Sequence, residues 1–235
     1  MISVDTAVKI VTDVIETLPS KTVPFESALG LCLAKDVRSD INMPPFDRSA
    51  MDGYAVVAED TAHTPVELVV IEDIAAGHMP TKKMQRGQVS KIMTGAAVPE
   101  GADAVVKVEE TEDLLPHNRV RILRTIDKGR NISKMGEDMK VGQIVLHKGM
   151  PIRSQEIGIL ATVGKSRVEV FSTPTVGIIS TGTELVDVES KPAAAQIRNS
   201  NGYSLAAQAR RLNADVELLG TVKDTKEEIS SMMRK

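Results

Sequence analysis

The feature that most constrains the fold is a change of pattern at Thr173-Pro174. The run TVGIIS (175–180) that follows reads as a continuous apolar strand, which is typical of a strand buried on both faces of a parallel sheet. A helix is then expected at about 202–213, a strand at 215–220, and a helix opened by the capping box Thr225–Glu228. This order of strands and helices predicts an open α/β sheet for the end of the chain.

The part of the chain before this boundary has a different pattern. From Tyr54 to about Ile132, short apolar runs alternate with Gly, Pro and Asn, and this spacing predicts a small β-barrel or sandwich. The runs are VELVVI (66–71), VSKIM (89–93), DAVVKV (103–108) and RVRIL (119–123).

Three further elements are expected outside this β-rich region. Residues 3–18 have apolar positions at helical spacing, with Ser3 as the N-cap and Pro19 as the stop. The apolar run 31–33 predicts a strand, in which Cys32 would be a small core residue. Ser154 is expected to cap a short helix. The fold class is therefore mixed α and β, in more than one domain.

Composition excludes several functions. The net charge is -3, so the chain has no basic excess that would favour nucleic acid or an anionic membrane as partner. With one cysteine, Cys32, neither an internal disulfide framework nor a Cys-rich zinc site can form. No apolar run approaches the ~20 residues that span a bilayer, and the N-terminus does not resemble a signal peptide. We expect a soluble cytoplasmic protein.

Three loops in the first two thirds of the chain could carry chemistry. Asp52, beside Gly53, offers an exposed carboxylate that can approach a metal-bound or phosphorylated ligand, although a plain turn is equally good. Thr94 lies in a loop of small residues (93–101) whose backbone N–H groups could bind an oxyanion. Asp138 could bind a metal or shape its loop. For the last two loops, taken alone, an ordinary turn is the better interpretation.

The fourth loop, Ser180-Thr181-Gly182-Thr183-Glu184, has the strongest position. It follows a parallel strand at the sheet edge where open α/β folds bind ligands; its hydroxyls and glycine suit phosphate, and Glu184 suits a metal ion. Asp224 follows the next strand at the same edge, or else it caps the helix that follows. A bound Mg²⁺ would reconcile several carboxylates with several phosphate-binding loops, so the residues indicate nucleotide or phosphoryl chemistry.

Taken together and in this order, the motifs resemble those of the molybdopterin molybdenumtransferase family (MoeA and the E domain of gephyrin). The resemblance covers essentially all of residues 3–235. The segments that carry it are Ala28-Leu29-Gly30, Pro45-Phe46-Asp47-Arg48-Ser49-Ala50-Met51-Asp52-Gly53-Tyr54-Ala55, Ile92-Met93-Thr94-Gly95-Ala96, Gly101-Ala102-Asp103-Ala104-Val105-Val106, Gly136-Glu137-Asp138 and Ser180-Thr181-Gly182-Thr183-Glu184-Leu185.

The resemblance implies an enzyme of molybdenum cofactor biosynthesis. Such proteins ligate molybdate to adenylylated molybdopterin and release AMP in a Mg²⁺-dependent step. They are elongated homodimers whose active site lies between the α/β domain of one subunit and the N-terminal region of the other. Molybdopterin adenylyltransferase would act upstream. The residues carried over are Asp52, Thr94 and Glu184 as catalytic, Ser180, Thr181, Gly182, Asp138 and Asp224 as cofactor-binding, and Asp52 and Glu184 also as metal ligands.

The resemblance also implies a domain plan. Residues 1–46 and 133–172 would form the N-terminal dimerisation region, residues 47–132 an inserted β-barrel-like domain, and residues 173–235 the start of an α/β molybdopterin-binding domain.

One departure from the family shapes this expectation. The family continues with a Gly-Gly-x-Ser phosphate loop and a C-terminal barrel, and neither is in this sequence. We therefore expect an N-terminal portion of the enzyme that does not turn over alone. The alternatives are a non-catalytic dimerising scaffold of the same family and an unrelated Mg²⁺-nucleotide enzyme.

Overall fold

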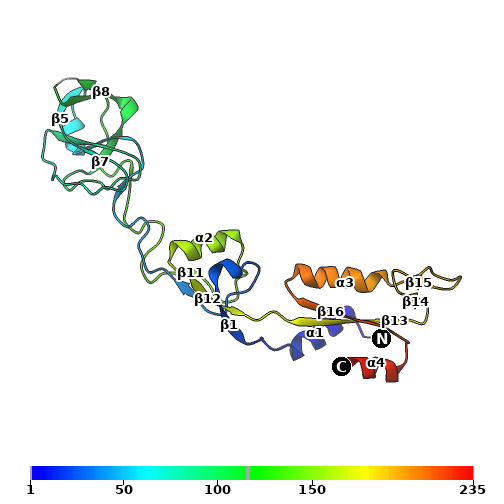
Figure 1. Cartoon of the computed structure of the whole chain (residues 1–235). Helices are drawn as coiled ribbons and strands as arrows, with labels where there is room; N and C mark the ends of the chain where they lie inside the picture. The colour runs from blue at the N-terminus through cyan, green and yellow to red at the C-terminus, as the bar shows by residue number, and fades with distance from the viewer. Residues whose placement is uncertain (1, 115–116, 235) are drawn as a thin grey trace. The chain divides into compact units, whose positions relative to one another are not determined.

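The protein is described by a computed structural model that covers residues 2–114 and 117–234. The chain divides into two compact units (Figure 1). We call Arg38–Val145 the central unit, and Met1–Val37 with Leu146–Lys235 the terminal unit. Each unit is described by itself.

The central unit is built on one curled six-stranded sheet (Figure 1). The strand order is β7-β4-β6-β5-β9-β8, and only the β5–β6 pair within it is parallel. The bounds are β4 Gly53–Val56, β5 Val66–Ile74, β6 Gln88–Ile92, β7 Ala104–Lys107, β8 Thr111–Leu114 and β9 Arg119–Ile122. The four apolar runs predicted as strands are thus confirmed as β5, β6, β7 and β9.

Both faces of this sheet are buried, which explains why β4 has no polar alternation. One core cluster includes Tyr54 and Val56, and a second, on the opposite face, includes Ala55. The remaining buried members are Leu68, Val89, Ala104, Val106, Val120 and Ile122 in the first cluster, and Ile74, Met84, Ile92, Ala96 and Val105 in the second. Successive side chains of a strand point to opposite faces, so a strand covered on both sides is apolar throughout.

Short elements complete the central unit. β3 (Arg48–Ser49) pairs with β10 (Ile132–Ser133) in antiparallel register. The 3-10 helices η2 (Ala58–Thr61) and η3 (Val108–Glu110) connect strands of the large sheet. β2 (Val37–Arg38) and β11 (Ile144–Leu146) form a further two-stranded sheet, whose residues are divided between the two units.

The terminal unit begins with α1 (Val4–Val14). Ser3 is its N-cap, as predicted, because its side chain accepts a hydrogen bond from the Thr6 backbone N–H at 3.1 Å. The predicted end at residue 18 is wrong, since Ile15 already has an extended backbone. No residue of α1 is buried, so no tertiary packing holds the β-branched residues before Pro19 in a last helical turn.

A small region of the terminal unit, made of β1, β12, η1 and α2, comes next. β1 (Ser20–Pro24) pairs antiparallel with β12 (Arg167–Phe171), and η1 (Phe25–Ser27) follows β1. The strand predicted at residues 31–33 is wrong: Cys32 and Leu33 make only isolated bridges, and Cys32 is exposed rather than in the core.

Helix α2 (Ser154–Thr162) belongs to the same region. Its N-cap is Arg153 and not Ser154. The Glu156 carboxylate accepts a hydrogen bond from the Arg153 backbone N–H at 2.8 Å, and this contact starts the helix one residue earlier than predicted.

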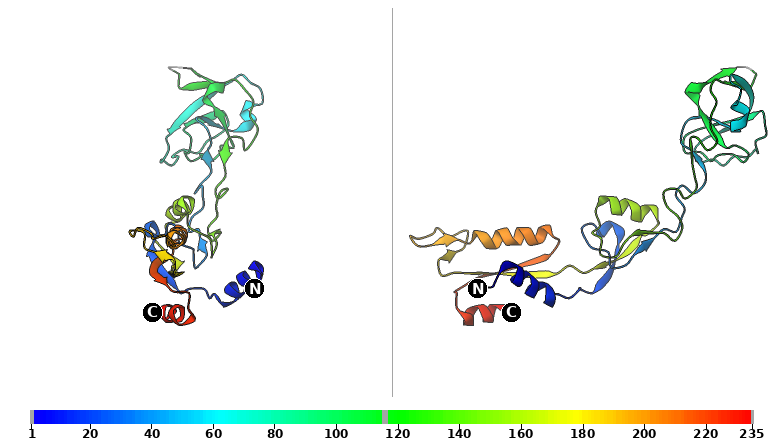
Figure 2. Two further views of the ribbon diagram at one scale, coloured as in Figure 1. Left: turned by 90° about the vertical axis from the view of Figure 1, so that its right-hand side faces the viewer. Right: turned by 180° about the vertical axis from the view of Figure 1, so that it is seen from behind.

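The rest of the terminal unit is an α/β arrangement in the predicted order. β13 (Thr175–Thr181) and β16 (Asp215–Val222) are parallel neighbours, and α3 (Ser200–Arg211) and α4 (Lys226–Met233) lie on opposite faces of the pair (Figures 1 and 2). The prediction that 175–180 is buried on both faces is wrong, since Ile178 is the one buried residue of β13. A two-stranded sheet leaves both of its edges uncovered, so most of β13 stays partly exposed.

Two short strands lie between β13 and α3. β14 (Leu185–Val186) and β15 (Ile197–Arg198) pair in parallel. None of the helices in the described part of the chain has the length and apolar character needed to cross a bilayer.

Candidate functional site

The clearest pairing of candidate residues joins Asp52 to Thr94 in the central unit. The backbone N–H and the hydroxyl of Thr94 both donate to Asp52 Oδ1, each at 2.7 Å. These two bonds, the backbone one first, hold the pKa of Asp52 below its ordinary value. Both residues are exposed, so the pair presents an ionised carboxylate with a fixed orientation to solvent.

Buried Ser49 holds the two turns of this pair together. Its backbone N–H donates to Ala96 O at 2.9 Å, and its carbonyl accepts from Gly95 N at 2.8 Å. Its side-chain hydroxyl donates to Met51 O at 2.5 Å and is 1% exposed with the rest of the residue. The turn 49–52 is therefore clamped to the turn 93–96, and Gly95 with φ +82° makes the second turn possible.

The loop that carries Asp138 is bound to the segment just before the turn 49–52. Asp47 accepts hydrogen bonds from Lys134 Nζ and from the Met135 backbone N–H, both at 2.8 Å. Asp138 lies 3.8 Å from Arg48, measured from Oδ2 to Nη2. The loops that carry Asp52, Thr94 and Asp138 are thus brought together by β3, β10 and these side chains.

The fourth loop belongs to the terminal unit. The Glu184 carboxylate folds over Gly182 so closely that a Cβ at position 182 would lie 2.8 Å from Oε1. The Gly182 N–H donates to Val222 O at 3.1 Å, which joins the ends of β13 and β16. The alternative prediction that Asp224 caps the last helix is wrong, because Thr225 is the N-cap and accepts from the Glu228 N–H at 3.4 Å.

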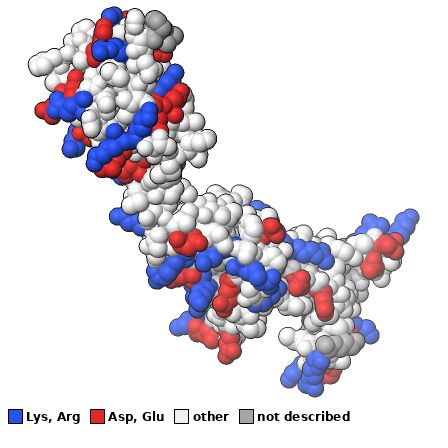
Figure 3. Space-filling model, turned by 60° about the vertical axis from the view of Figure 1, so that its left-hand side comes forward, with Lys and Arg blue, Asp and Glu red and all other residues white. Residues whose placement is uncertain are grey.

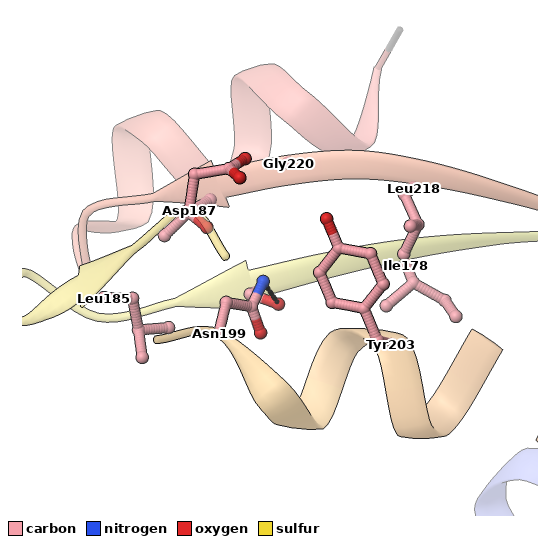
Figure 4. A pocket seen from close by; sticks show the side chains of 9 residues that line it. Ile178, Leu185, Asp187, Asn199, Tyr203, Leu218 and Gly220 are labelled. Carbon is pink, nitrogen blue, oxygen red and sulfur yellow. Dashed lines mark hydrogen bonds between the residues drawn. The ribbon is translucent and has the colours of Figure 1, made fainter. Parts of the chain in front are cut away.

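A pocket of about 330 Å³ lies beside this loop, between α3 and the strand pair (Figure 4). Ser180 is the one predicted site residue among those that line it. The lining residues are Ile178, Ser180, Leu185, Asp187, Asn199, Tyr203, Leu218, Gly220 and Thr221.

Asn199 links helix α3 to strand β13 at one side of this pocket. Its Oδ1 caps α3 by accepting from the Gly202 N–H at 3.0 Å, and its Nδ2 donates to Ser180 Oγ at 2.8 Å. A Cβ at Gly202 would lie 2.9 Å from Ser180 Oγ, so glycine lets the helix start against the strand.

Sequence reasoning missed the pocket residues Asp187, Asn199, Tyr203 and Thr221. Asn199 had a usable signal, since Asn before the helix beginning at Ser200 is a preferred N-cap. Asp187 and Tyr203 carry no motif of their own, and their convergence depends on the course of the loop between β13 and α3.

The acidic side chains that the structure describes do not form a preorganised metal site by themselves. Within the described residues, no group of three or more His, Cys, Asp or Glu side chains is close enough to hold an ion. Asp52 and Glu184, the two predicted metal ligands, belong to different units. On the face shown in Figure 3, basic and acidic side chains are interspersed rather than gathered in a patch of one sign.

Two family models match the chain. "MoeA N-terminal region (domain I and II)" matches residues 2–164, and "Probable molybdopterin binding domain" matches residues 177–235. The first includes Asp52, Thr94 and Asp138, and the second includes the pocket beside α3.

Similar proteins agree with these matches. A molybdopterin molybdenumtransferase of Bacillus subtilis is 40% identical over 229 residues, which cover 95% of this chain and 53% of that protein. One of Staphylococcus epidermidis is 36% identical over 238 residues, covering 100% of this chain and 56% of that protein. The chain thus spans about half the length of these curated relatives.

The fold agrees as well. The crystal structure of the molybdopterin biosynthesis moeA protein from Pyrococcus horikoshii superposes with a TM-score of 0.86 at 33% identity, over 98% of this chain and 62% of that one. With a family model covering most of the chain and relatives matching its whole length, this chain belongs to the MoeA family.

Proposed function

We propose that the protein to which this chain belongs transfers molybdate to adenylylated molybdopterin and releases AMP. The family and the names of the relatives support this reaction class. The single observation that carries the proposal is the Asp52–Thr94 pair, in which one carboxylate oxygen is held by two donors.

The geometry of the pair determines what each group can offer a ligand. The Thr94 hydroxyl has one proton, and that proton is directed at Asp52. Toward a ligand, Thr94 Oγ1 is therefore an acceptor. Asp52 Oδ2 has no hydrogen-bond partner among the described residues and remains free for a cation or a donor.

These oxygens fit the chemistry of Mg²⁺. Mg²⁺ prefers oxygen ligands and is commonly held by one or two carboxylates together with substrate phosphates and waters. Asp52 would supply the carboxylate, with Glu184 as the second candidate. When bound, Mg²⁺ would neutralise charge on the phosphate of the AMP leaving group. The two hydrogen bonds from Thr94 leave the Asp52 carboxylate little freedom to rotate, so its negative charge has a fixed position relative to a bound ion.

We further propose that the terminal unit contributes the molybdopterin site. Ser180 and Thr181 would donate hydroxyl hydrogen bonds to the substrate, while Gly182 allows close approach and Asp224 lies beyond the end of β16. The Gly182 N–H is already used by Val222 O, so in this role it is the absence of a side chain that matters. Asp138, which lies 3.8 Å from Arg48, would shape the loop cluster of the central unit.

The proposal extends to fold and partners. In it, residues 47–132 are an inserted barrel-like domain, residues 1–46 and 133–172 a dimerisation region, and residues 173–235 the start of an α/β molybdopterin-binding domain. A homodimer is supported by α1, whose apolar residues include Val8 and Val11, each more than half exposed. An adenylyl-transferring enzyme must act before this one, because the substrate carries an adenylyl group.

The test is AMP release from adenylylated molybdopterin, measured on the protein as its source cell makes it. Asp52→Ala is expected to lower the rate by about 10²-fold or more, the scale of losing one preorganised electrostatic contact. Asp127→Ala is the matched control, an exposed aspartate of the central unit, and should leave the rate unchanged. Equal rates in the Asp52 and Asp127 variants would contradict the proposal.

A further inference from the structure

We propose that Tyr203 and Asp187 recognise the pterin ring of the substrate: Tyr203 by stacking on one face of the ring, and Asp187 by accepting two hydrogen bonds from its edge. This inference rests on the function proposed above. It assigns roles to Tyr203 and Asp187, which lie outside the sequence motifs described above.

The first support is the shape of the pocket. Its volume of about 330 Å³ is near the lower end of the ~300–1,000 Å³ typical of small-molecule sites. Ile178 and Leu218 line it from the two strands, and Leu185 lines it from β14. These apolar side chains share the pocket with the polar Ser180, Asp187, Asn199 and Thr221. Apolar walls beside placed polar groups suit a flat heterocycle with polar edges.

Tyr203 gives the pocket its aromatic wall. It lies on the first turns of α3, and its ring stands in the space between the helix and the strand pair (Figure 4). The residue is 44% exposed, so a ring face is open to a ligand. Offset stacking of two aromatic rings is favourable beyond the apolar area that it buries.

Asp187 supplies the polar anchor. The carboxylate reaches into the same space as the Tyr203 ring (Figure 4). The Glu189 N–H donates to its Oδ1 at 3.2 Å and orients it, while Oδ2 accepts no hydrogen bond from any residue that the structure describes. A carboxylate can accept from two parallel N–H groups at once.

A pterin presents this pair of donors. Its exocyclic amino group and the adjacent ring N–H point the same way along one edge, as the two N–H groups of a guanidinium do. Its ring carbonyl is an acceptor. Ser180 Oγ already accepts from Asn199 Nδ2, so its own hydroxyl proton is free to be donated to such a carbonyl.

The test compares two ring probes by fluorescence titration on the protein from its source cell. Pterin carries the exocyclic amino group, whereas lumazine has a carbonyl in its place and would set an oxygen against the Asp187 carboxylate. We expect the protein to bind pterin roughly tenfold or more tighter than lumazine, since hydrogen bonds to a charged acceptor are among the stronger ones.

Three variants and one control make the assignment specific. Asp187→Asn should abolish the preference for pterin, while Glu217→Gln, at an exposed position of β16 outside the pocket lining, should keep it. Tyr203→Leu should weaken both probes by a similar factor, and Tyr203→Phe should bind both as the parent does. All of these side chains are at least partly exposed, so folding should survive, and circular dichroism checks it.

Each outcome either supports or overturns the roles assigned to Tyr203 and Asp187. Equal binding of the two probes, no binding of either, or an unchanged preference in Asp187→Asn would overturn the assignment. The AMP-release assay is separate: release without ring selectivity would reject the roles of Tyr203 and Asp187 alone. Ring selectivity without AMP release would keep them and reject the proposed reaction.

Discussion

The backbone N–H and the hydroxyl of Thr94 converge on one oxygen of Asp52, although 42 residues separate the two in sequence. The antiparallel register of β4 and β6 brings them together, because Gly53 is paired with Ile92. Asp52 precedes Gly53 and Thr94 follows Ile92 by two residues, so both lie just beyond the same end of the strand pair.

Removing the Thr94 hydroxyl should raise the pKa of Asp52. We expect Thr94→Val to raise it only part of the way toward the ordinary value, because the stronger contribution comes from the backbone N–H, which stays. Thr94→Ser retains the hydroxyl and is the control. The measurement is an NMR titration of the Asp52 carboxyl carbon. Since the folded pKa is depressed, this contact favours folding above the ordinary carboxyl pKa, and its effect is lost as the pH falls through the folded value. Identical titrations of the Val and Ser variants would show that the hydroxyl bond is unimportant.

Gly53→Ala should destabilise the central unit. A Cβ at this position would lie 1.9 Å from Val106 O, so β4 and β7 would have to separate. The expected loss is about 1–3 kcal/mol or more in the free energy of unfolding, the range for overpacked buried sites. Urea denaturation followed by Tyr54 fluorescence, in a Tyr203→Phe background, reports this unit alone.

The control for the Gly53 substitution should change the free energy of unfolding in the opposite direction. Gly158 lies in the exposed interior of α2 with nothing near its missing Cβ, so Gly158→Ala should stabilise the terminal unit by about 0.5–1 kcal/mol, measured by urea denaturation followed by helical circular dichroism. Destabilisation by both substitutions would mean that the close contact at Gly53 is not the cause.

Glu156 makes the stability of the terminal unit depend on pH. Hydrogen bonds from the Arg153 side chain, and then from its backbone, lower the pKa of Glu156 from 4.5 to about 2. A depressed pKa stabilises the fold above the unfolded value, and the effect disappears as the pH falls from 4.5 to about 2. The difference in unfolding free energy between the parent and Glu156→Gln should therefore shrink across this window. Gln155→Asn, which changes an exposed side chain of the same helix without adding or removing a titratable group, should show a constant difference.

The apolar face of α1 should mediate self-association. An isolated helix of 11 residues is marginal in water, and this one has no buried residue, so it needs a partner surface. Val8→Lys with Val11→Lys should shift sedimentation toward the monomer, whereas Asp13→Lys, on the opposite side of the helix, should not. A dimer that survives the double substitution would exclude α1 from the interface.

Local patterns predicted much of the fold. Alternating or short apolar runs located β5, β6, β7 and β9, and caps located the starts of α1 and α4. The errors have one local and one tertiary cause. A local contact, in which the Glu156 carboxylate accepts from the Arg153 backbone N–H, moved the start of α2, and the lack of tertiary packing shortened α1.

The site was predictable in its parts rather than in its assembly. Asp52, Thr94 and Asp138 were found as separate loops, each weak alone, and sheet register joins them. Tyr203 and Asp187 were missed because no periodicity or motif specifies which side chains a long loop brings to a helix. Their convergence is a property of the folded chain.

Asn199 uses both ends of one amide, the oxygen on Gly202 and the nitrogen on Ser180. The first turn of α3 and the end of β13 therefore share one side chain, and neither can open without releasing the other. In native-state hydrogen exchange the amide of Gly202 should exchange at the rate set by the strand, and slower than an ordinary frayed helix end. A single residue thus makes the helix start and the strand end one cooperative unit.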